Sequence, residues 1–532
     1  MRKYILLSLL ALPIVATAQV KQSEGARKLN FVDYAITNLY VDTVNEKEIV
    51  EAGIRGMLEK LDPHSSYLTA EEVKEMSEGL EGNFDGIGIQ FMMQKDTVYV
   101  IQTIAGGPSE KVGIIAGDRI VFINDTVVSG VGKSADDIKK KLRGTRGTTV
   151  NVLVKRAGES GLIPFRITRD QIPVYSVDAA YMVDKNTGYI RLSRFGATTF
   201  DEFVEAVVPM IRLKRMKNLI IDLQGNGGGY LTAATRIANM LLDENELIVY
   251  TEGRNSPRTE ERAADKGLFR KGKLIILADE TSASASEILS GAVQDWDRGV
   301  IVGRRTFGKG LVQRPIQMPD GSMVRLTVAR YYTPTGRSIQ RPYSDGNKVY
   351  QHDLMERYNR GEMISADSIH FADSLKYTTF KNKRTVYGGG GIMPDYFVPI
   401  DTTKYSDYHR NIVAKGVMPQ VVTDYVDSNR KELSSKFKRV DDFIDGYEAG
   451  DSLIAELRAA ADKEKIEFKE EEFTRSLPLI KLQLKALIAR DLFDMAAYFR
   501  VINVSNDALT KALEIMADDE LYNRLLGTKI SK

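Results

Sequence analysis

The chain has 532 residues, with 74 Lys and Arg, 72 Asp and Glu, only 4 His and no cysteine. This length predicts several domains, because single hydrophobic cores rarely grow beyond about 250–300 residues. The lack of cysteine excludes disulfides, cysteine-ligated zinc or iron–sulfur sites and a thiol nucleophile, and the near-zero net charge gives no support for a nucleic-acid partner.

The first 18 residues follow the order of a secretion signal. Two basic residues precede an apolar run over 4–15, and Ala16-Thr17-Ala18 follows. An apolar run that ends in A-x-A is typical of a cleaved signal peptide, and this one is too short to span a bilayer as a helix. An uncleaved anchor or a buried helix is the plainer alternative. We therefore predict a periplasmic protein and leave a peripheral association with the membrane open.

The next two regions differ in texture. Residues 19–81 carry apolar side chains at helical spacing over 26–39 and 46–61, and are expected to form a short helical layer. The expected buried stripe of the second helix consists of Ile49, Ile54, Met57 and Leu61. Residues 82–172 consist of short β-branched runs punctuated by glycine, with a helix over 134–142, and predict a small β-rich domain.

Residues 173–402 alternate continuous apolar runs with helical patterns. The runs Leu219–Leu223, Leu274–Ala278 and Val300–Val302 are of the kind that is buried on both faces of a sheet, so an α/β core is predicted. Within this core, residues 343–385 are polar and are expected to form an irregular insertion. The last region, residues 403–532, is charged and helical, and we find no motif in it.

A glycine pair opens the β-rich domain at Gly86–Phe91. Free amides of such a loop can hold a carboxylate, and the strand that follows can accept a peptide by β-augmentation. A dinucleotide-binding loop is the weaker alternative, because Phe91 stands where G-x-G-x-x-G needs its third glycine. A plain hairpin is the structural alternative.

A second stretch in this domain resembles the signature of a PDZ domain. It begins with Gly113-Ile-Ile-Ala-Gly117-Asp118 and continues into a strand that ends at Asn124. The resemblance implies a groove that binds the terminal carboxylate and the last side chain of a peptide. The residues expected to line this groove are Gly86, Ile87, Gly88, Ile89, Ile138 and Leu142.

Two strand-to-helix turns in the α/β core could carry chemistry. The glycine cluster that ends the run Ile221–Gly229 places free amides at the carboxyl end of a strand, where open α/β sheets bind ligands. In Thr281–Glu287 a serine hydroxyl lies beside amides that can hold an oxyanion. Each has a structural alternative: a tight turn for the first, and for the second a capping box, which Ser284 and Glu287 match.

The base that would activate such a serine is not evident from the local pattern. None of the four histidines (His64, His352, His370 and His409) lies in the α/β segments that hold the serine, so a Ser-His-Asp triad has little support. A lysine with a lowered pKa is another common base for serine. Lys309 lies between two glycines, although a solvated loop lysine is the plainer interpretation.

Taken together, these segments resemble the carboxyl-terminal processing, or tail-specific, serine peptidases over about residues 30–400. The matching motifs are L-D-P-H-S-S-Y-L, D-L-x-G-N-G-G-G, T-S-A-S-A-S-E-I, T-F-G-K-G-L-V-Q, A-R-Y-Y-T-P-T-G-R-S-I-Q and G-G-G-G-I-x-P-D. The resemblance implies a multidomain α+β chain, with a crotonase/ClpP-like α/β protease core, an inserted PDZ domain and helical ends. One departure is Gln224, where the family often has arginine, and altered local support is expected there.

In that family the serine and the lysine are 25 positions apart, and a glutamine follows four residues later. This spacing selects Ser284, rather than Ser282 or Ser286, as the nucleophile. The other implied roles are Lys309 as general base, Gln313 as the residue that orients it, the amides of Ala285 and of Gly228 or Gly229 as oxyanion hole, and Arg169 as a link between tail binding and the active site.

The function that follows from the resemblance is an exported endopeptidase for proteins with apolar C-terminal tails. No cofactor, metal or nucleic acid is expected, and assembly through the terminal helices predicts a homodimer or a higher oligomer. Two alternatives stay open: a catalytically inactive PDZ module that binds tails or acts like a chaperone, and a crotonase-like enzyme.

Overall fold

The core is built on a six-stranded sheet with the order β10-β11-β12-β15-β16-β21. Only the β10–β11 pair is antiparallel. The computed structural model describes residues 23–264 and 267–528. The strands are β10 (Val177–Met182), β11 (Thr187–Leu192), β12 (Asn218–Asp222), β15 (Leu274–Ala278), β16 (Val300–Gly303) and β21 (Tyr396–Phe397). Every residue of β15 and β16 is buried, which explains why these runs are apolar throughout.

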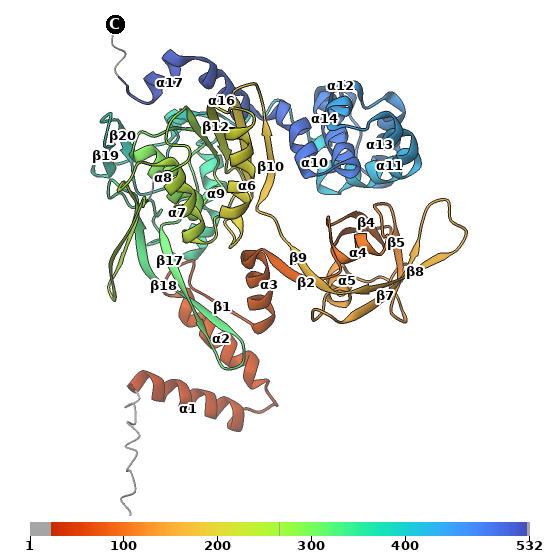
Figure 1. The fold of residues 1–532 in the computed structure, drawn as a ribbon. Helices are drawn as coiled ribbons and strands as arrows, with labels where there is room; N and C mark the ends of the chain where they lie inside the picture. Colours follow the sequence, from red (N-terminus) through yellow and green to blue (C-terminus); the bar gives the residue numbers. More distant parts are fainter. Residues whose placement is uncertain (1–22, 265–266, 529–532) are drawn as a thin grey trace, which may run out of the picture.

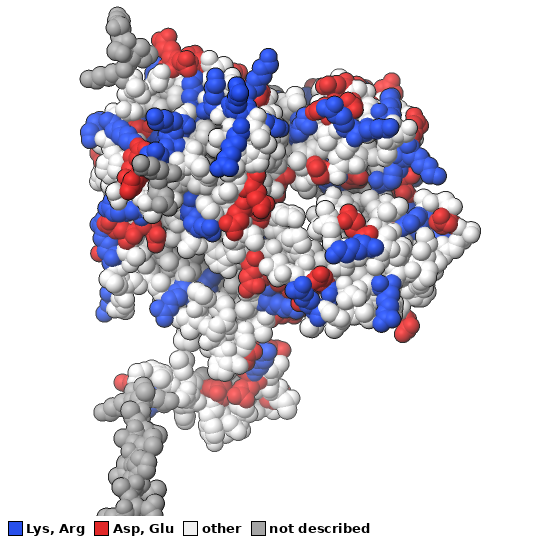
Figure 2. All heavy atoms as spheres, in the orientation of Figure 1, with Lys and Arg blue, Asp and Glu red and all other residues white. Residues whose placement is uncertain are grey.

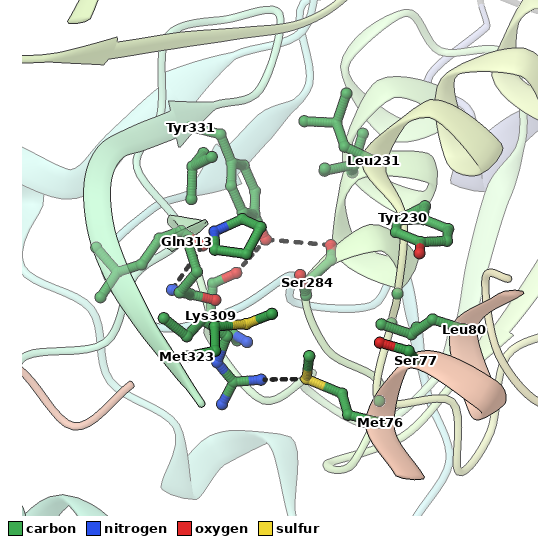
Figure 3. Close-up of a pocket in the computed structure, with 18 of the residues that line it drawn as sticks. Met76, Ser77, Leu80, Tyr230, Leu231, Ser284, Lys309, Gln313, Met323 and Tyr331 are labelled. Carbon is green, nitrogen blue, oxygen red and sulfur yellow. Dashed lines mark hydrogen bonds between the residues drawn. The ribbon is translucent and has the colours of Figure 1, made fainter. Parts of the chain in front are cut away.

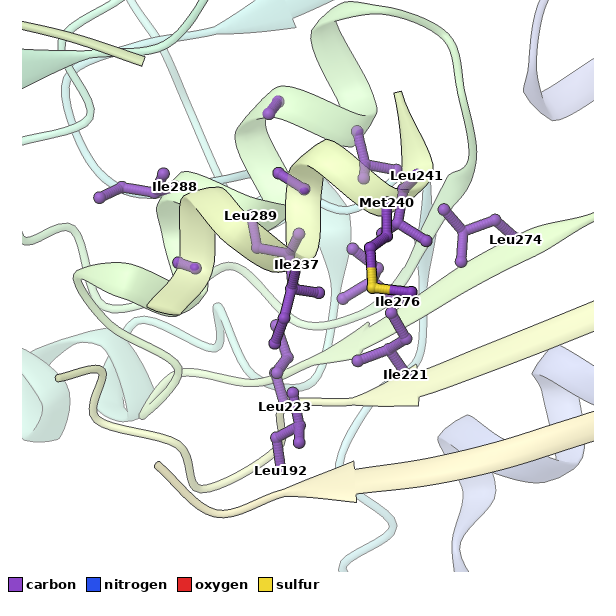
Figure 4. Close-up of a cluster of buried hydrophobic side chains, with 14 of the residues drawn as sticks. Leu192, Ile221, Leu223, Ile237, Met240, Leu241, Leu274, Ile276, Ile288 and Leu289 are labelled. Carbon is purple, nitrogen blue, oxygen red and sulfur yellow. The ribbon is translucent and has the colours of Figure 1, made fainter. Parts of the chain in front are cut away.

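Helices from distant parts of the chain cover the two faces of this sheet. The helices are α6 (Thr199–Arg212), α7 (Leu231–Leu241), α8 (Ala285–Asp295), α16 (Asp507–Ala517) and α17 (Asp519–Leu525). Ile221 and Ile276 pack with α7 and α8 in one cluster (Figure 4). The alternate residues Ile220 and Ile275 pack with α16 and α17 in another, so the two clusters lie on opposite faces. The end of the chain therefore belongs to the core.

A second sheet of five antiparallel strands carries one wall of the site described below. Its order is β1-β18-β13-β14, and β17 pairs with β18. The strands are β1 (Ser66–Leu68), β13 (Leu247–Gly253), β14 (Ser256–Arg262), β17 (Leu311–Gln317) and β18 (Met323–Tyr332). Because β1 comes from the N-terminal region, that region is partly built into the core.

The three N-terminal helices are only partly covered. They are α1 (Glu24–Leu39), α2 (Glu46–Glu59) and α3 (Ala70–Glu81), and α1 projects from the molecule in Figure 1. No residue of α1 is buried. The expected buried stripe of α2 is wrong in part, because Ile49, Met57 and Leu61 are exposed, and these helices present broad uncharged areas in Figure 2. The predicted signal, residues 1–18, lies outside the described residues.

The β-rich domain is attached to the core by a two-stranded ribbon. Strand β2 (Asn83–Gly86) enters it and pairs antiparallel with β9 (Asp170–Pro173), which leaves it. Its sheet has the order β3-β4-β5-β7-β8, with β6 paired to β5. Its elements are β3 (Ile89–Gln94), β4 (Thr97–Thr103), α4 (Pro108–Lys111), β5 (Arg119–Ile123), β6 (Thr126–Val127), α5 (Ala135–Leu142), β7 (Thr149–Lys155) and β8 (Leu162–Thr168). Strand β3 therefore lies at an open edge of this sheet.

Six helices form a separate bundle after the core, which we call the C-terminal bundle. They are α10 (Asp407–Ala414), α11 (Val417–Lys436), α12 (Val440–Gly446), α13 (Asp451–Lys463), α14 (Glu470–Leu492) and α15 (Met495–Ile502), with their own apolar cluster. The bundle lies beside the β-rich domain in Figure 1. Asp427 of α11 forms an ion pair of 2.6 Å with Arg119 of β5, and the Gln94 amide donates to Asp424 at 3.2 Å. The bundle thus holds the β-rich domain from the side.

The segment over 343–385 is more ordered than its polarity predicts. It contains the helix α9 (Asn347–Asn359) and the strands β19 (Lys376–Thr378) and β20 (Thr385–Tyr387). The prediction of irregular structure is therefore wrong. The segment is held in place by hydrogen bonds of polar side chains, which leave no apolar pattern in the sequence. Arg357 is 2% exposed and donates to the carbonyls of Arg305 and Thr306. Among the described residues, no helix is long and apolar enough to cross a membrane.

Candidate active site

Ser284 stands on a strained turn between β15 and α8. Its φ is +58°, a conformation that costs a non-glycine residue energy unless the surroundings fix it. Its amide donates to Glu287 Oε2 at 2.8 Å, and its carbonyl accepts a hydrogen bond from the Tyr331 hydroxyl at 3.1 Å. These contacts hold the residue so that its side chain faces a cavity (Figure 3).

Glu287 connects the turn of Ser284 to the loop of Lys309. Its Oε1 accepts from the Thr306 hydroxyl (2.6 Å) and the Gly308 amide (2.7 Å), and its Oε2 accepts from the amides of Ser284 and Lys309 (2.9 Å). The side chain is fully buried, and burial raises the pKa of this carboxyl to about 7, while the hydrogen bonds oppose the rise. The capping pattern seen in the sequence identifies Glu287 but not its contacts with the second loop.

Lys309 lies in the loop between β16 and β17. Its backbone carbonyl also accepts a hydrogen bond from Tyr331, so one hydroxyl contacts both the serine and the lysine backbones. Burial, and secondly the charge of Arg325, lower the pKa of Lys309 to about 8, against the opposing charges of Glu287 and Asp62. A lysine with such a pKa has a substantial neutral fraction just above neutral pH and can accept a proton.

Ser284 and Lys309 line one cavity of about 650 Å³, which we call the central cavity. Figure 3 shows both side chains in it, with α3 on one side and the β17–β18 hairpin on the other. Its apolar lining residues are Met76, Leu80, Leu231, Ile288, Leu311, Val312, Pro315 and Met323. A cavity of this size, with polar groups at one point of an apolar wall, has the form of a substrate site.

Gln313, the residue expected to orient the lysine, also lies at the central cavity. Gln313 lines it from β17, and its amide donates to the Leu311 carbonyl (3.2 Å) and the Thr327 hydroxyl (3.4 Å). In the described part of the chain, no hydrogen bond joins Gln313 to Lys309. Its orienting role therefore stays a prediction.

Three backbone amides were expected to form the oxyanion hole. The Gly228 amide donates to the Asn226 side chain at 2.9 Å, whereas the amides of Ala285 and Gly229 have no acceptor in the described chain. A Cβ on Gly228 would lie 2.8 Å from the Ser284 Cβ, so only glycine lets this turn approach the serine. The amides of Ala285 and Gly229 are the better oxyanion candidates.

A groove of about 330 Å³ lies between β3 and α5 of the β-rich domain. Its lining includes Gly86, Ile87, Gly88, Ile89 and Leu142 of the expected set. Ile138 does not line it, because its side chain is fully buried in the domain core. The open edge of β3 leaves room for an added strand, which is how an extended peptide gains main-chain hydrogen bonds.

Arg169 lies where the β-rich domain returns to the ribbon, and it acts within that domain. Its guanidinium donates to the carbonyls of Lys141 and Leu142 (both 2.9 Å) and to the Thr148 hydroxyl (3.0 Å). It thereby caps the carboxyl end of α5. No hydrogen bond joins its side chain to the core in the described residues, so its coupling role stays a prediction.

His64 was set aside from the sequence because of its place in the chain, yet it lies close to Lys309. Its Nε2 shares a hydrogen bond of 2.8 Å with the Tyr350 hydroxyl. Burial, and secondly the charge of Lys309, lower the pKa of His64 to about 4, so the ring is neutral at physiological pH. In the sequence, the L-D-P-H-S-S motif was the signal that could have identified His64.

Gln224, the departure from the family pattern, accepts a hydrogen bond from Asn506 at the start of α16.

Comparisons with known proteins agree with this organisation. The model of peptidase family S41 matches residues 186–346, that of the PDZ domain residues 86–164, and that of the activating protease CtpB N-terminal domain residues 12–72. A family of unknown function matches residues 408–494, within the C-terminal bundle. The β-rich domain is called the PDZ domain below.

Several curated relatives match more than half of this chain. The carboxy-terminal-processing protease of Bartonella bacilliformis is 35% identical over 333 residues, which cover 62% of this chain and 76% of the relative. The carboxy-terminal processing protease CtpB of Bacillus subtilis is 32% identical over 335 residues, with 62% and 69% covered. A solved photosystem II D1 C-terminal processing protease is 30% identical, with 59% of this chain and 84% of that chain covered and a TM-score of 0.35. The chain therefore belongs to the carboxy-terminal processing proteases, serine peptidases of family S41 that carry a PDZ domain.

Proposed function

We propose that this protein is an exported endopeptidase that binds the C-terminal tails of proteins in the PDZ groove and cleaves nearby bonds with Ser284 and Lys309. The observation that supports the dyad most directly is that both side chains line the central cavity while Glu287 binds both of their backbones. The pKa of Lys309, lowered to about 8, supports its role as the base.

In the proposed reaction, neutral Lys309 accepts the proton of the Ser284 hydroxyl while the Ser284 oxygen attacks the scissile carbonyl carbon. The amides of Ala285 and Gly229 stabilise the resulting oxyanion. The C–N bond then breaks, and the protonated lysine gives its proton to the leaving amine. Water, deprotonated by the same lysine, hydrolyses the ester that remains on Ser284 and regenerates the serine.

Tail recognition rests on the groove between β3 and α5. The amides near Gly86 and Gly88 can hold a terminal carboxylate, while the apolar side chains of Ile89 and Leu142 suit an apolar last residue. No residue of the C-terminal bundle lines this groove, so the bundle supports the PDZ domain without covering its groove.

Incubation with an unstructured protein that ends in apolar residues tests this function. The chain from residue 19 onward should cut it at pH 9, with the fragments identified by mass spectrometry, and the Ser284→Ala variant should not. Equal cutting by both chains would refute the nucleophile. Tail binding without any cutting by the wild type would identify an inactive tail-binding module instead.

Export and assembly complete the proposal. The order of residues 1–18 supports removal of a signal in the periplasm, which N-terminal sequencing of the secreted chain would test.

Exposed Leu29, Phe31, Val32 and Tyr34 on α1 support a homodimer in which a second copy covers this helix. Sedimentation should give a dimer for the wild type and a monomer for Phe31→Glu, and a monomeric wild type would contradict the assembly.

A further inference from the structure

Arg325, on β18, places an unpaired cation in the wall of the central cavity. The one hydrogen bond of its side chain in the described chain joins Nη1 to the Met76 sulfur at 3.8 Å, the dashed line at Met76 in Figure 3. Thioether sulfur is a weak acceptor. The buried Nε has no acceptor among the described residues. Other arginines of this molecule have oxygen acceptors: Arg337 and Arg384 pair with Asp295 and Asp297, and Arg169 donates to backbone carbonyls.

Such a cation is costly to leave unpaired. Burial alone lowers the pKa of Arg325, with no carboxylate acting in the opposite direction, yet a guanidinium stays protonated in proteins. Arg325 is half-buried, and a charge that loses part of its hydration is normally offset by a counter-ion with hydrogen bonds. Since no residue of the described chain supplies that counter-ion, the site has an unmet preference for an anion.

The cavity itself indicates where the anion comes from. Its lining residues include no Asp or Glu, and the one other cation is Lys309, which must be neutral to act as the base. The planar fork of an arginine binds a carboxylate through two parallel hydrogen bonds. Because Ser284 lines the same cavity, a peptide in position for attack would bring its own groups to Arg325.

A second role for Arg325 can be separated from this one. Burial lowers the pKa of Lys309 most, and the charge of Arg325 lowers it further. Glu287 of α8 and Asp62 of the turn between α2 and β1 raise it, and His64 is neutral. The effect of Arg325 on this pKa acts on the base and therefore changes the cleavage rate of every substrate by the same factor. Recognition of an anion instead changes the ratio of kcat/KM between a substrate that carries a carboxylate and its neutral match.

We propose that Arg325 is a specificity-determining residue that binds a carboxylate of the substrate close to the cleaved bond. The carboxylate comes from an Asp or Glu side chain or from the terminus of a short tail. This inference rests on the proposed peptidase function and names a substrate class for its cavity.

Matched peptides test it. One series carries Asp or Asn at each position from three before to three after the cleaved bond, with an amidated end. A second, neutral series ends one, two or three residues after the cleaved bond, each as acid or amide. For the wild type, a carboxylate at one position should raise kcat/KM by about tenfold over its neutral match. Arg325→Gln should bring that ratio close to one, Arg325→Lys should keep part of it, and the exposed Arg330→Gln on the same strand should keep all of it.

Binding to the Ser284→Ala chain separates this inference from the peptidase function. Fluorescence anisotropy of the labelled peptides should give a lower Kd for the carboxylate form than for its neutral match. The double variant Ser284→Ala/Arg325→Gln should lose this difference, even where no peptide is cut. A wild type without any carboxylate preference in either series, or a preference that persists in Arg325→Gln, overturns the inference. Loss of all cutting with a retained, arginine-dependent binding preference refutes the peptidase function alone.

Discussion

The molecule has two candidate sites for a polypeptide, the central cavity and the PDZ groove, and they are built in different ways. The cavity depends on particular side chains: Ser284, Lys309 and the buried Glu287 that holds both of their loops. The groove depends mainly on backbone, with the open edge of β3 and the glycines that precede it.

This difference has a consequence for how the two places tolerate change. A strained serine and a lysine of lowered pKa work only while the hydrogen bonds around them persist. An open strand edge accepts many sequences, because main-chain groups are the same in every peptide. Substitutions should therefore affect the cavity sharply and the groove gradually.

The largest expected effect is that of Ser284→Ala. We expect hydrolysis to fall at least a thousandfold, because the nucleophile is lost, while the Kd for a tail peptide in the PDZ groove stays unchanged. Cleavage assays and calorimetry on the same preparation measure the two quantities. A parallel loss of tail binding would show that the two places are not independent.

Lys309→Arg should be nearly as inactive, although it keeps the positive charge. A guanidinium stays protonated and cannot accept the serine proton. For the wild type, kcat/KM should rise with pH with a midpoint near the Lys309 pKa of about 8, because the neutral lysine is the base. An active arginine variant, or a rate that falls between pH 7 and 9, would remove the lysine from the mechanism.

Glu287→Gln should weaken both stability and rate. An amide nitrogen cannot accept from a backbone amide. Even if it takes the Oε1 position and donates to the Thr306 hydroxyl, the bond from the Gly308 amide is lost, and that donor is left buried without an acceptor. We expect a stability loss of roughly 2–4 kcal/mol in denaturant titrations, and a fall in kcat in the folded chain. The exposed Glu75→Gln on α3 is the control and should leave kcat unchanged.

Amidation of the substrate's tail changes the groove's ligand without altering the enzyme. Removal of the terminal charge should raise KM about tenfold and leave kcat unchanged, since a charge-assisted hydrogen bond is lost far from the chemistry. Steady-state kinetics with acid and amide forms of one substrate measure this. An equal KM for both forms would exclude terminal-carboxylate recognition.

The smallest effect concerns the contact between the C-terminal bundle and the PDZ domain. Asp427→Arg should repel Arg119, expose Tyr99 and its neighbours to hydrogen exchange, and change activity only a few-fold. The double variant Asp427→Arg/Arg119→Asp should restore protection. Unchanged exchange in the single variant would mean that the PDZ domain is held by other contacts.

The parts of the fold that are buried on both faces could be predicted from the sequence. The strands at Leu274–Ala278 and Val300–Val302 were found because a sheet buried on both faces needs continuous apolar runs. The helix α9 was missed because arginines such as Arg357 satisfy its neighbours through hydrogen bonds, which leave no apolar pattern. The exposed stripe on α2 was expected to be buried, since periodicity shows that a face is apolar but not what covers it.

The candidate site was predictable where spacing carried the information. The interval between Ser284 and Lys309 selected both residues by resemblance, and both line one cavity. Contacts across long separations were not predictable: Tyr331 binds both backbones from β18, and His64 arrives from the N-terminal region. Such long-range contacts depend on how sheets and loops pack, and the pattern of a single sequence does not show which residues will be brought together.

The ribbon of β2 and β9 makes the PDZ domain a removable cassette. Asn83 and Pro173 are paired neighbours, so the chain enters and leaves the domain at one place. Excision of the cassette and closure of the ribbon with a tight turn should leave the core's connectivity intact, because insertions with adjacent ends are tolerated. Other recognition domains could then be grafted onto the same ribbon, giving a peptidase whose recognition of the tail is exchanged separately from its active site.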